Sequence, residues 1–186
     1  MDTDSFYFKY IKVDYDPADI ERFLEVYPLL RARFDKVDLA QLRTLVPSIM
    51  SWFDSKGMEP FIAIAISHDP TYKQQIHKDV MKNSEHERIL ALNFPLNSQA
   101  KNSVTRMYSV IGEDQPHIKM TKEGNKELPY YYYTEDQVQL AGIYMSTSPV
   151  LVNVSHPHSA YNCTPYRRGV LSFRFIEDPW FLVDEQ

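Results

Sequence analysis

The sequence predicts a mainly β fold, a sandwich or jelly roll of about eight short strands buttressed by N-terminal helices. Three observations predict it. Apolar residues repeat at helical spacing only in the first third of the 186 residues, whereas from Glu59 onward the apolar period changes to two. Strand-like runs then follow one another, separated by Pro, Asn and Gly, without the intervening helices that a parallel sheet requires. The composition, 44% hydrophobic with 24% charged residues, fits a folded chain.

Two helices are expected before the first strand. Asp16 and Pro17 suit a helix start, because Asp accepts hydrogen bonds at an N-cap and Pro is preformed for the first turn. Pro28 should end that helix. A second apolar stripe covers residues 39–53, with a kink expected at Pro47. The length fits one domain, 1–186, with 1–58 as a helical buttress and 59–178 as the β core.

Eight strands are expected after the helices, over residues 61–67, 76–80, 88–94, 104–111, 138–145, 150–154, 158–162 and 169–176. A long interval, 112–136, interrupts this series. It is rich in charge and contains Pro116 and Pro129, which predict a mobile loop over a site. Within it, Tyr130 to Tyr133 also fit an edge strand with alternating faces.

Charge and composition exclude several kinds of partner. The net charge is −5, from 20 Lys+Arg against 25 Asp+Glu, without a long basic run, which disfavours nucleic acid. No stretch approaches the roughly 20 apolar residues that span a bilayer, and the acidic residues 1–4 do not resemble a signal peptide. The single cysteine, Cys163, cannot form an internal disulfide. We therefore expect a cytoplasmic protein without a membrane partner.

His77 and Asp79 form the first candidate cluster. Residues i and i+2 of a strand face the same side, so an imidazole and a carboxylate would converge there, as metal binding requires. A third ligand is available after the strand at 150–154, where His156 and His158 lie two residues apart. Strand geometry allows either to face the metal; the distance to Arg168 and the preceding Pro157 favour His158.

The last strand carries an unusual polar face. Arg168, Ser172 and Arg174 alternate with the apolar residues Leu171 and Phe173. Arginines that point inward from a strand are costly to bury unless anionic groups meet them. Something acidic should therefore lie against this face. For Arg174 a structural ion pair is favoured over a substrate contact, whereas Arg167 should point to solvent.

These residues resemble the pattern of the iron(II)- and 2-oxoglutarate-dependent oxygenases, whose fold is the double-stranded β-helix, a jelly roll. The family pattern is HxD, a distal His, an Arg or Lys about ten residues later, and a Ser or Thr four residues further. It is matched here by His77, Asp79, His158, Arg168 and Ser172. Residues 92–97 and 157–162 also resemble the small prolyl- and aspartyl-hydroxylase-like members. The resemblance covers about residues 60–176.

The resemblance implies that His77, Asp79 and His158 hold iron(II) as a facial triad. Arg168 would bind the distal carboxylate of 2-oxoglutarate through its planar fork, and Ser172 would add a hydrogen bond. Three further residues are expected as cosubstrate or outer contacts: Asn93, Tyr108 and Asn162. The implied reaction uses dioxygen to convert 2-oxoglutarate to succinate and CO₂ while hydroxylating a C–H bond of a small molecule or protein side chain that the sequence does not identify.

Two other interpretations stay open. A binding or interaction module of the same β fold would have a structural metal or none, but it would have no reason to combine the triad with Arg168. A cupin-like enzyme using zinc or manganese without 2-oxoglutarate leaves Arg168 unexplained. The remaining histidines, His68, His86 and His117, are expected in turns or loops and in contact with solvent.

Overall fold

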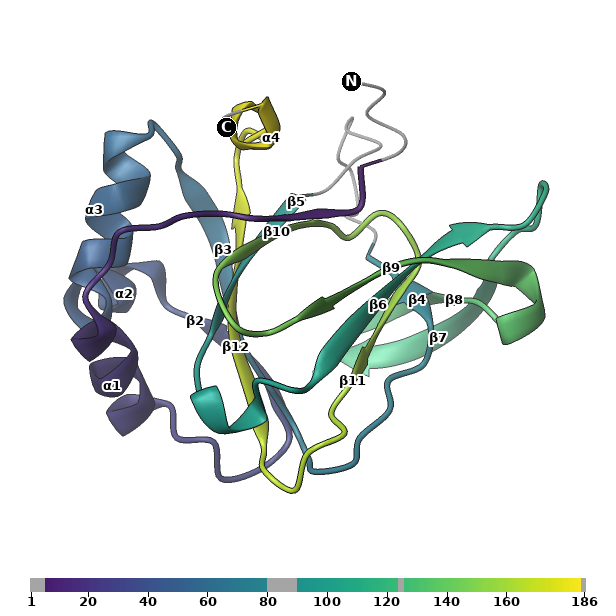
Figure 1. Ribbon diagram of the computed structural model, residues 1–186, viewed down its shortest axis with the longest axis horizontal. Helices are drawn as coiled ribbons and strands as arrows, with labels where there is room; N and C mark the ends of the chain where they lie inside the picture. The colour runs from purple at the N-terminus through teal and green to yellow at the C-terminus, as the bar shows by residue number, and fades with distance from the viewer. Residues whose placement is uncertain (1–5, 80–89, 124–125, 185–186) are drawn as a thin grey trace.

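The protein is described by a computed structural model that covers residues 6–79, 90–123 and 126–184. Two antiparallel six-stranded sheets form a sandwich, and helices cover the outer face of one of them (Figure 1). The mainly β jelly roll expected from the sequence is therefore confirmed.

The first sheet contains the final strand at its centre. Its order is β1-β10-β5-β12-β3-β2, and the strands are β1 Phe8–Tyr10, β10 Val150–Asn153, β5 Leu90–Pro95, β12 Arg168–Phe175, β3 Pro60–His68 and β2 Arg33–Val37. All eight residues of β12 are buried. Because β12 pairs with both β5 and β3, its inward face lies in the middle of the sheet, away from either edge.

The second sheet has the order β7-β8-β4-β11-β6-β9. Its strands are β7 His117–Glu123, β8 Lys126–Tyr132, β4 His77–Lys78, β11 His158–Tyr161, β6 Val104–Val110 and β9 Val138–Met145. The short strand β4 pairs with β11 so that His77 lies opposite His158. The β7–β8 hairpin extends this sheet beyond β4.

Helices α1 (Pro17–Val26), α2 (Leu39–Leu45) and α3 (Pro47–Ser55) pack against the first sheet, and α4 (Phe181–Asp184) follows β12. Asp16 caps α1 through Ala18 N, at 2.9 Å, as its sequence predicts. The main core lies between these helices and the sheet, where the Phe53 ring packs edge-on against Phe94 and Phe173. This layer holds the first sheet rigid, and β12 with it.

All eight predicted strands are present in the described part of the chain, and three further ones there, β1, β2 and β7, were not predicted. The fourth, β8, includes Tyr130 to Tyr132, which were expected as a possible edge strand but lie in a strand paired on both sides, with β7 and β4. β1 and β2 lie within the segment expected to be a helical buttress and form the two edges of the first sheet. The interval 112–136, expected to be a mobile loop, instead forms the β7–β8 hairpin. Ile118 is 60% exposed and Met120 58%, so the apolar residues of β7 do not mark a buried face.

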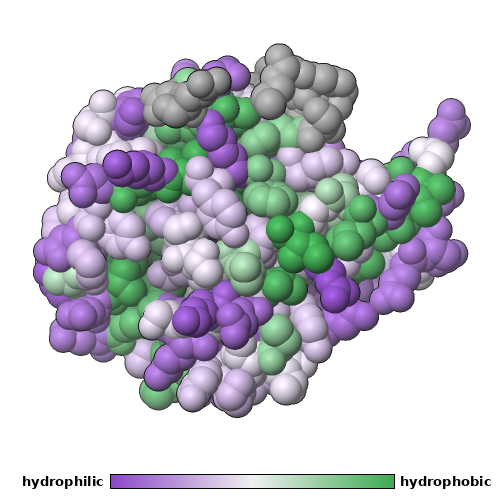
Figure 2. All heavy atoms as spheres, in the orientation of Figure 1, coloured by the Kyte–Doolittle hydropathy of each residue, from purple (hydrophilic) through white to green (hydrophobic). Residues whose placement is uncertain are grey.

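The two faces of β9 differ sharply. Ile143 and Met145 are exposed, and hydrophobic side chains gather over this strand in Figure 2. Tyr144, between them, points inward and is buried. The Tyr10 hydroxyl bonds both the N–H and the carbonyl of Met145 at 3.0 Å, which satisfies backbone groups at this edge of the second sheet.

None of the helices in the described ranges is both long and apolar enough to cross a membrane.

Candidate functional site

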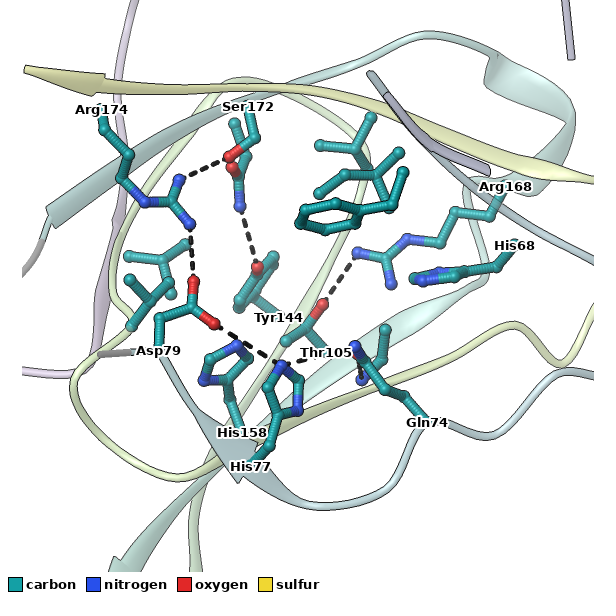
Figure 3. Close-up of a pocket in the computed structure, with 17 residues that line it drawn as sticks. His68, Gln74, His77, Asp79, Thr105, Tyr144, His158, Arg168, Ser172 and Arg174 are labelled. Atoms are coloured by element: carbon teal, nitrogen blue, oxygen red, sulfur yellow. Dashed lines mark hydrogen bonds and ion pairs between the residues drawn. The ribbon is translucent and has the colours of Figure 1, made fainter. Parts of the chain in front are cut away.

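A cavity of about 560 Å³, counted with its open mouth, lies between the two sheets. Strands of both sheets line it and both contribute polar side chains, with β12 supplying Arg168, Ser172 and Arg174 (Figure 3). The inward residues of β12 are Arg168, Val170, Ser172 and Arg174, whereas Leu171, Phe173 and Phe175 join the helix-covered core. The period-two alternation of the final strand therefore places its polar face on this cavity, as expected from the sequence.

His77, Asp79 and His158 meet at one end of the cavity. Each offers a nitrogen or oxygen atom, and these atoms all lie within 4.8 Å of one another. His77 Nε2 is 3.7 Å from Asp79 Oδ1. The Asp79 N–H donates to the carbonyl of Val154 at 2.9 Å, which holds the backbone after β4 against the chain that leads into β11. Three side chains from two neighbouring strands could thus hold one metal ion.

The two histidines are held in the same way. His77 Nδ1 lies 3.0 Å from the carbonyl of Gln75, and His158 Nδ1 lies 2.9 Å from the carbonyl of His156. A carbonyl can only accept, so each Nδ1 carries a proton and Nε2 is the ring nitrogen that remains for a metal. Metal-binding imidazoles are normally oriented by a hydrogen bond of this kind, donated by the ring nitrogen that does not bind the metal.

The protonation states suit a cation. Burial lowers the pKa of His158 to about 4, and the nearby His77 adds to this effect, so the imidazole is neutral at pH 7. Burial alone would raise the pKa of Asp79, but the charge of Arg174 is the largest opposing cause, its hydrogen bond to the carboxylate adds to it, and the pKa stays below its usual value. The cluster therefore presents His158 as a neutral nitrogen donor next to the Asp79 carboxylate, with the His77 imidazole beside them.

Arg174 meets an acidic group, as the sequence suggested. Its Nη2 donates to Asp79 Oδ2 at 2.8 Å and its Nη1 donates to Ser172 Oγ at 2.6 Å. The ion pair leaves Oδ1 as the Asp79 oxygen that faces His77. Arg174 therefore orients the carboxylate from the opposite sheet, across the cavity (Figure 3).

Arg168 is a second buried cation, only 4% exposed. Its Nε donates to Ser146 Oγ at 3.1 Å and its Nη2 to Thr105 Oγ1 at 2.8 Å, while Nη1 is buried without a hydrogen-bond partner. Burial lowers the pKa of this guanidinium. Within the ranges that the structure covers, no carboxylate pairs with Arg168. Of the two arginines on the polar face of β12, Arg174 thus has an anionic partner among the described residues and Arg168 has none.

Other predicted residues fall into two groups. Ser172 and Asn93 line the cavity. Tyr108 does not, because Thr105 and Met107 occupy the inward positions of β6; its hydroxyl meets Ser159 Oγ at 3.2 Å. Asn162 is fully buried in the turn after β11, where its amide donates to the carbonyls of Asp69 and Tyr166 at 2.9 and 2.7 Å.

His156 and Arg167, which lie close in the chain to the predicted site residues, are not part of the three-residue cluster. The His156 ring packs against Tyr7 at a tilt of 38°, with ring centroids 4.6 Å apart. Arg167 forms an ion pair with Asp69 rather than pointing freely to solvent. His86 lies outside the described residues. Sequence reasoning missed the partners of Arg168, Thr105 and Ser146, which are small hydroxyl residues without a distinctive local pattern.

Comparisons with known proteins support the same fold. Neither a scan against protein-family models nor a search of curated proteins gives a match. Among solved structures, the epimerase SnoN in complex with Fe³⁺, alpha ketoglutarate and nogalamycin RO is 16% identical, with a TM-score of 0.58 over 96% of this chain and 85% of that chain. The non-heme monooxygenase ThoJ–Ni complex is 13% identical, with a TM-score of 0.54 over 92% and 74%.

A third structure, the non-heme alpha ketoglutarate dependent carbocyclase SnoK from nogalamycin biosynthesis, is 9% identical with a TM-score of 0.53 over 92% of this chain and 80% of that chain. At such identities the similarity establishes the fold alone. It confirms, at that level, the resemblance to iron- and 2-oxoglutarate-dependent oxygenases found in the sequence.

Proposed function

We propose that this protein is an iron(II)- and 2-oxoglutarate-dependent dioxygenase that hydroxylates a C–H bond of a substrate yet to be identified, releasing succinate and CO₂. The observation that carries the proposal is the combination, in one cavity, of a His-Asp-His cluster and a buried arginine without an anionic partner. The solved structures of similar fold include proteins whose names specify iron or alpha ketoglutarate, which supports the same class.

The donor set fits iron(II). Two imidazoles, each anchored through Nδ1 so that Nε2 remains as the ligand atom, and one carboxylate are the ligands of the facial triad, which leaves other coordination positions open. Iron, when bound, supplies the redox chemistry that couples decarboxylation of the keto acid to oxidation of the substrate. His77, Asp79 and His158 would hold the metal, and Arg174 would keep the Asp79 carboxylate ionised and oriented.

The anion pocket fits the cosubstrate. A carboxylate bound at Arg168 Nη1 would satisfy a buried donor and compensate a buried charge at the same time. The binding-module alternative explains neither this open donor nor its presence in the same cavity as the metal cluster. A metalloenzyme that uses no 2-oxo acid leaves Arg168 equally unexplained.

Arg174→Met is expected to weaken iron(II) binding roughly 10- to 100-fold, the usual cost of losing a partner that orients a metal ligand. Methionine keeps most of the stem but removes the ion pair to Asp79. Arg174→Lys should recover part of the affinity. Arg167→Met is the matched control, because Arg167 pairs with Asp69 and does not line the cavity. Equal metal affinity in the Arg174→Met and wild-type proteins would contradict this role.

The proposed reaction is tested by incubating the protein with iron(II), 2-oxoglutarate and air and measuring succinate. Slow, uncoupled formation of succinate is expected even without the true substrate, and Asp79→Ala should abolish it. If iron and 2-oxoglutarate both bind but succinate does not exceed the Asp79→Ala background, the binding-module interpretation replaces the enzyme.

A further inference from the structure

His68 is the neighbour of Arg168 that the sequence placed in a solvated turn. It is instead the last residue of β3 and lies directly opposite Arg168 in the β12–β3 pairing. Both side chains line the cavity. Figure 3 shows them on the side of the cavity away from Asp79 and His158.

The two side chains share an unusual property. Arg168 Nη1 and His68 Nδ1 are both buried side-chain nitrogens without a hydrogen-bond partner among the described residues. Leaving one buried polar group unsatisfied is costly, and most such groups in folded proteins are paired. Two of them on adjacent strands, facing one cavity, indicate a site for a ligand that accepts hydrogen bonds.

The His68 ring is neutral and held in place. Burial lowers its pKa to about 4, and the charge of Arg168 lowers it further in the same direction. A neutral imidazole has one N–H to donate. The ring stacks on Tyr72 with centroids 4.7 Å apart and an interplanar angle of 17°. Asn162 binds the carbonyl of the adjacent Asp69 at 2.9 Å, which fixes the chain just after His68.

Ser172, to which the family resemblance assigns the second hydrogen bond, is less well placed. It lies four residues beyond Arg168 on β12, about 13 Å along the strand at roughly 3.3 Å per residue. Its Oγ already accepts from Arg174. Arg168 donates from Nε to Ser146 and from Nη2 to Thr105. Nη1 is therefore the guanidinium nitrogen that has no hydrogen-bond partner among the described residues. A carboxylate there needs a second donor from a residue across the strand pair.

We propose that His68 is this donor: its Nδ1–H binds the distal carboxylate together with Arg168 Nη1 and selects dicarboxylic 2-oxo acids over those with an uncharged tail. The inference rests on the proposed function and adds a specificity residue to it. It also predicts the Nδ1–H tautomer for His68 in the complex.

The test compares two ligands and three substitutions by anaerobic calorimetry on iron(II)-loaded protein. The ligands are 2-oxoglutarate and 2-oxopentanoate, which carries a methyl group in place of the distal carboxylate. His68→Phe keeps a ring to stack on Tyr72 but removes the donor. It is expected to weaken 2-oxoglutarate binding about 10- to 100-fold, as for a hydrogen bond to a charged group, and to leave 2-oxopentanoate binding nearly unchanged.

His68→Asn and His68→Gln locate the donor on the ring. The amide nitrogen of Asn can occupy the place of Nδ1, and that of Gln the place of Nε2, so Asn should restore most of the affinity for 2-oxoglutarate and Gln should not. The matched control is His117→Phe, since His117 is an exposed histidine of β7 that stacks on Tyr132 and does not line the cavity. This control should bind both ligands as the wild type does.

The outcomes separate the inference from the proposed function. Equal weakening of both ligands by His68→Phe would show a packing role and overturn the inference, as would equal binding by the Asn and Gln variants. If Arg168→Ala loses 2-oxoglutarate while His68→Phe retains it, the inference alone fails. If the wild-type protein binds iron but not 2-oxoglutarate, the proposed function fails first.

Discussion

Arg168→Ala is expected to weaken 2-oxoglutarate binding about 10²- to 10³-fold while leaving iron(II) binding intact. Arg168 is only 4% exposed, and hydroxyl groups are its hydrogen-bond partners within the described part of the chain. Removing it would leave a buried carboxylate without its counter-charge, a loss of about 3–5 kcal/mol, at about 1.4 kcal/mol for each tenfold change. Calorimetry on the metal-loaded variant measures this loss.

Two further variants sharpen this experiment. Arg168→Lys should recover part of the affinity, because the charge remains but the planar set of donors is lost. Arg167→Ala is the control, since Arg167 is adjacent in the chain but pairs with Asp69 and does not line the cavity. Loss of 2-oxoglutarate binding in Arg167→Ala and its retention in Arg168→Ala would contradict the account.

Asp79→Ala and His158→Ala are each expected to abolish stoichiometric iron(II) binding. One of three donors disappears in each variant, and the loss should exceed the roughly 10- to 100-fold that outer partners of metal ligands cost. Asp79→Ala also leaves Arg174 without its carboxylate. Iron content after anaerobic reconstitution and desalting measures the effect.

His156→Ala is the matched control for the distal histidine. The side chain of His156 packs against Tyr7, and its carbonyl, which survives the substitution, holds His158 Nδ1. This variant should therefore retain iron. Should His156→Ala lose the metal while His158→Ala keeps it, the distal ligand would be His156.

The metal cluster and the inward face of β12 could be predicted because both depend on local alternation. His77 and Asp79 are two residues apart. On β12, whose register is regular up to Arg174, the side chains at alternate positions face the same side, and these include Arg168, Ser172 and Arg174. Leu171 and Phe173 lie on the other face of this strand, and their apolar side chains identify it as the face that packs in the core. A period of two, once recognised, orients every residue of such a strand.

His68 and the partner of Arg174 could not be predicted in the same way. His68 is paired with Arg168 one hundred residues later, and Arg174 reaches Asp79 from the other sheet. Such contacts depend on strand register and sheet packing, which no local pattern encodes. The adjoining Asp69 and Pro70 also carry a strong turn signal, so the sequence favoured a solvated loop where the strand in fact continues to His68.

The missed strands have different causes. β1 is only three residues long, and its pairing with β10 joins segments far apart in the chain. In β7, Ile118 and Met120 share one face and are both exposed, so the apolar residues of this strand do not mark a buried side. Tyr108 was expected near the cosubstrate, whereas Thr105 and Met107 take the inward positions of β6.

The central claim is that one cavity binds iron(II) and a 2-oxo dicarboxylic acid together. Anaerobic titration of 2-oxoglutarate into the iron(II)-loaded protein, followed by visible absorption, tests it most directly. We expect a weak metal-to-ligand charge-transfer band that saturates at one keto acid per chain and is lost in Asp79→Ala. Stoichiometric iron binding with neither the band nor calorimetric binding of 2-oxoglutarate would contradict it.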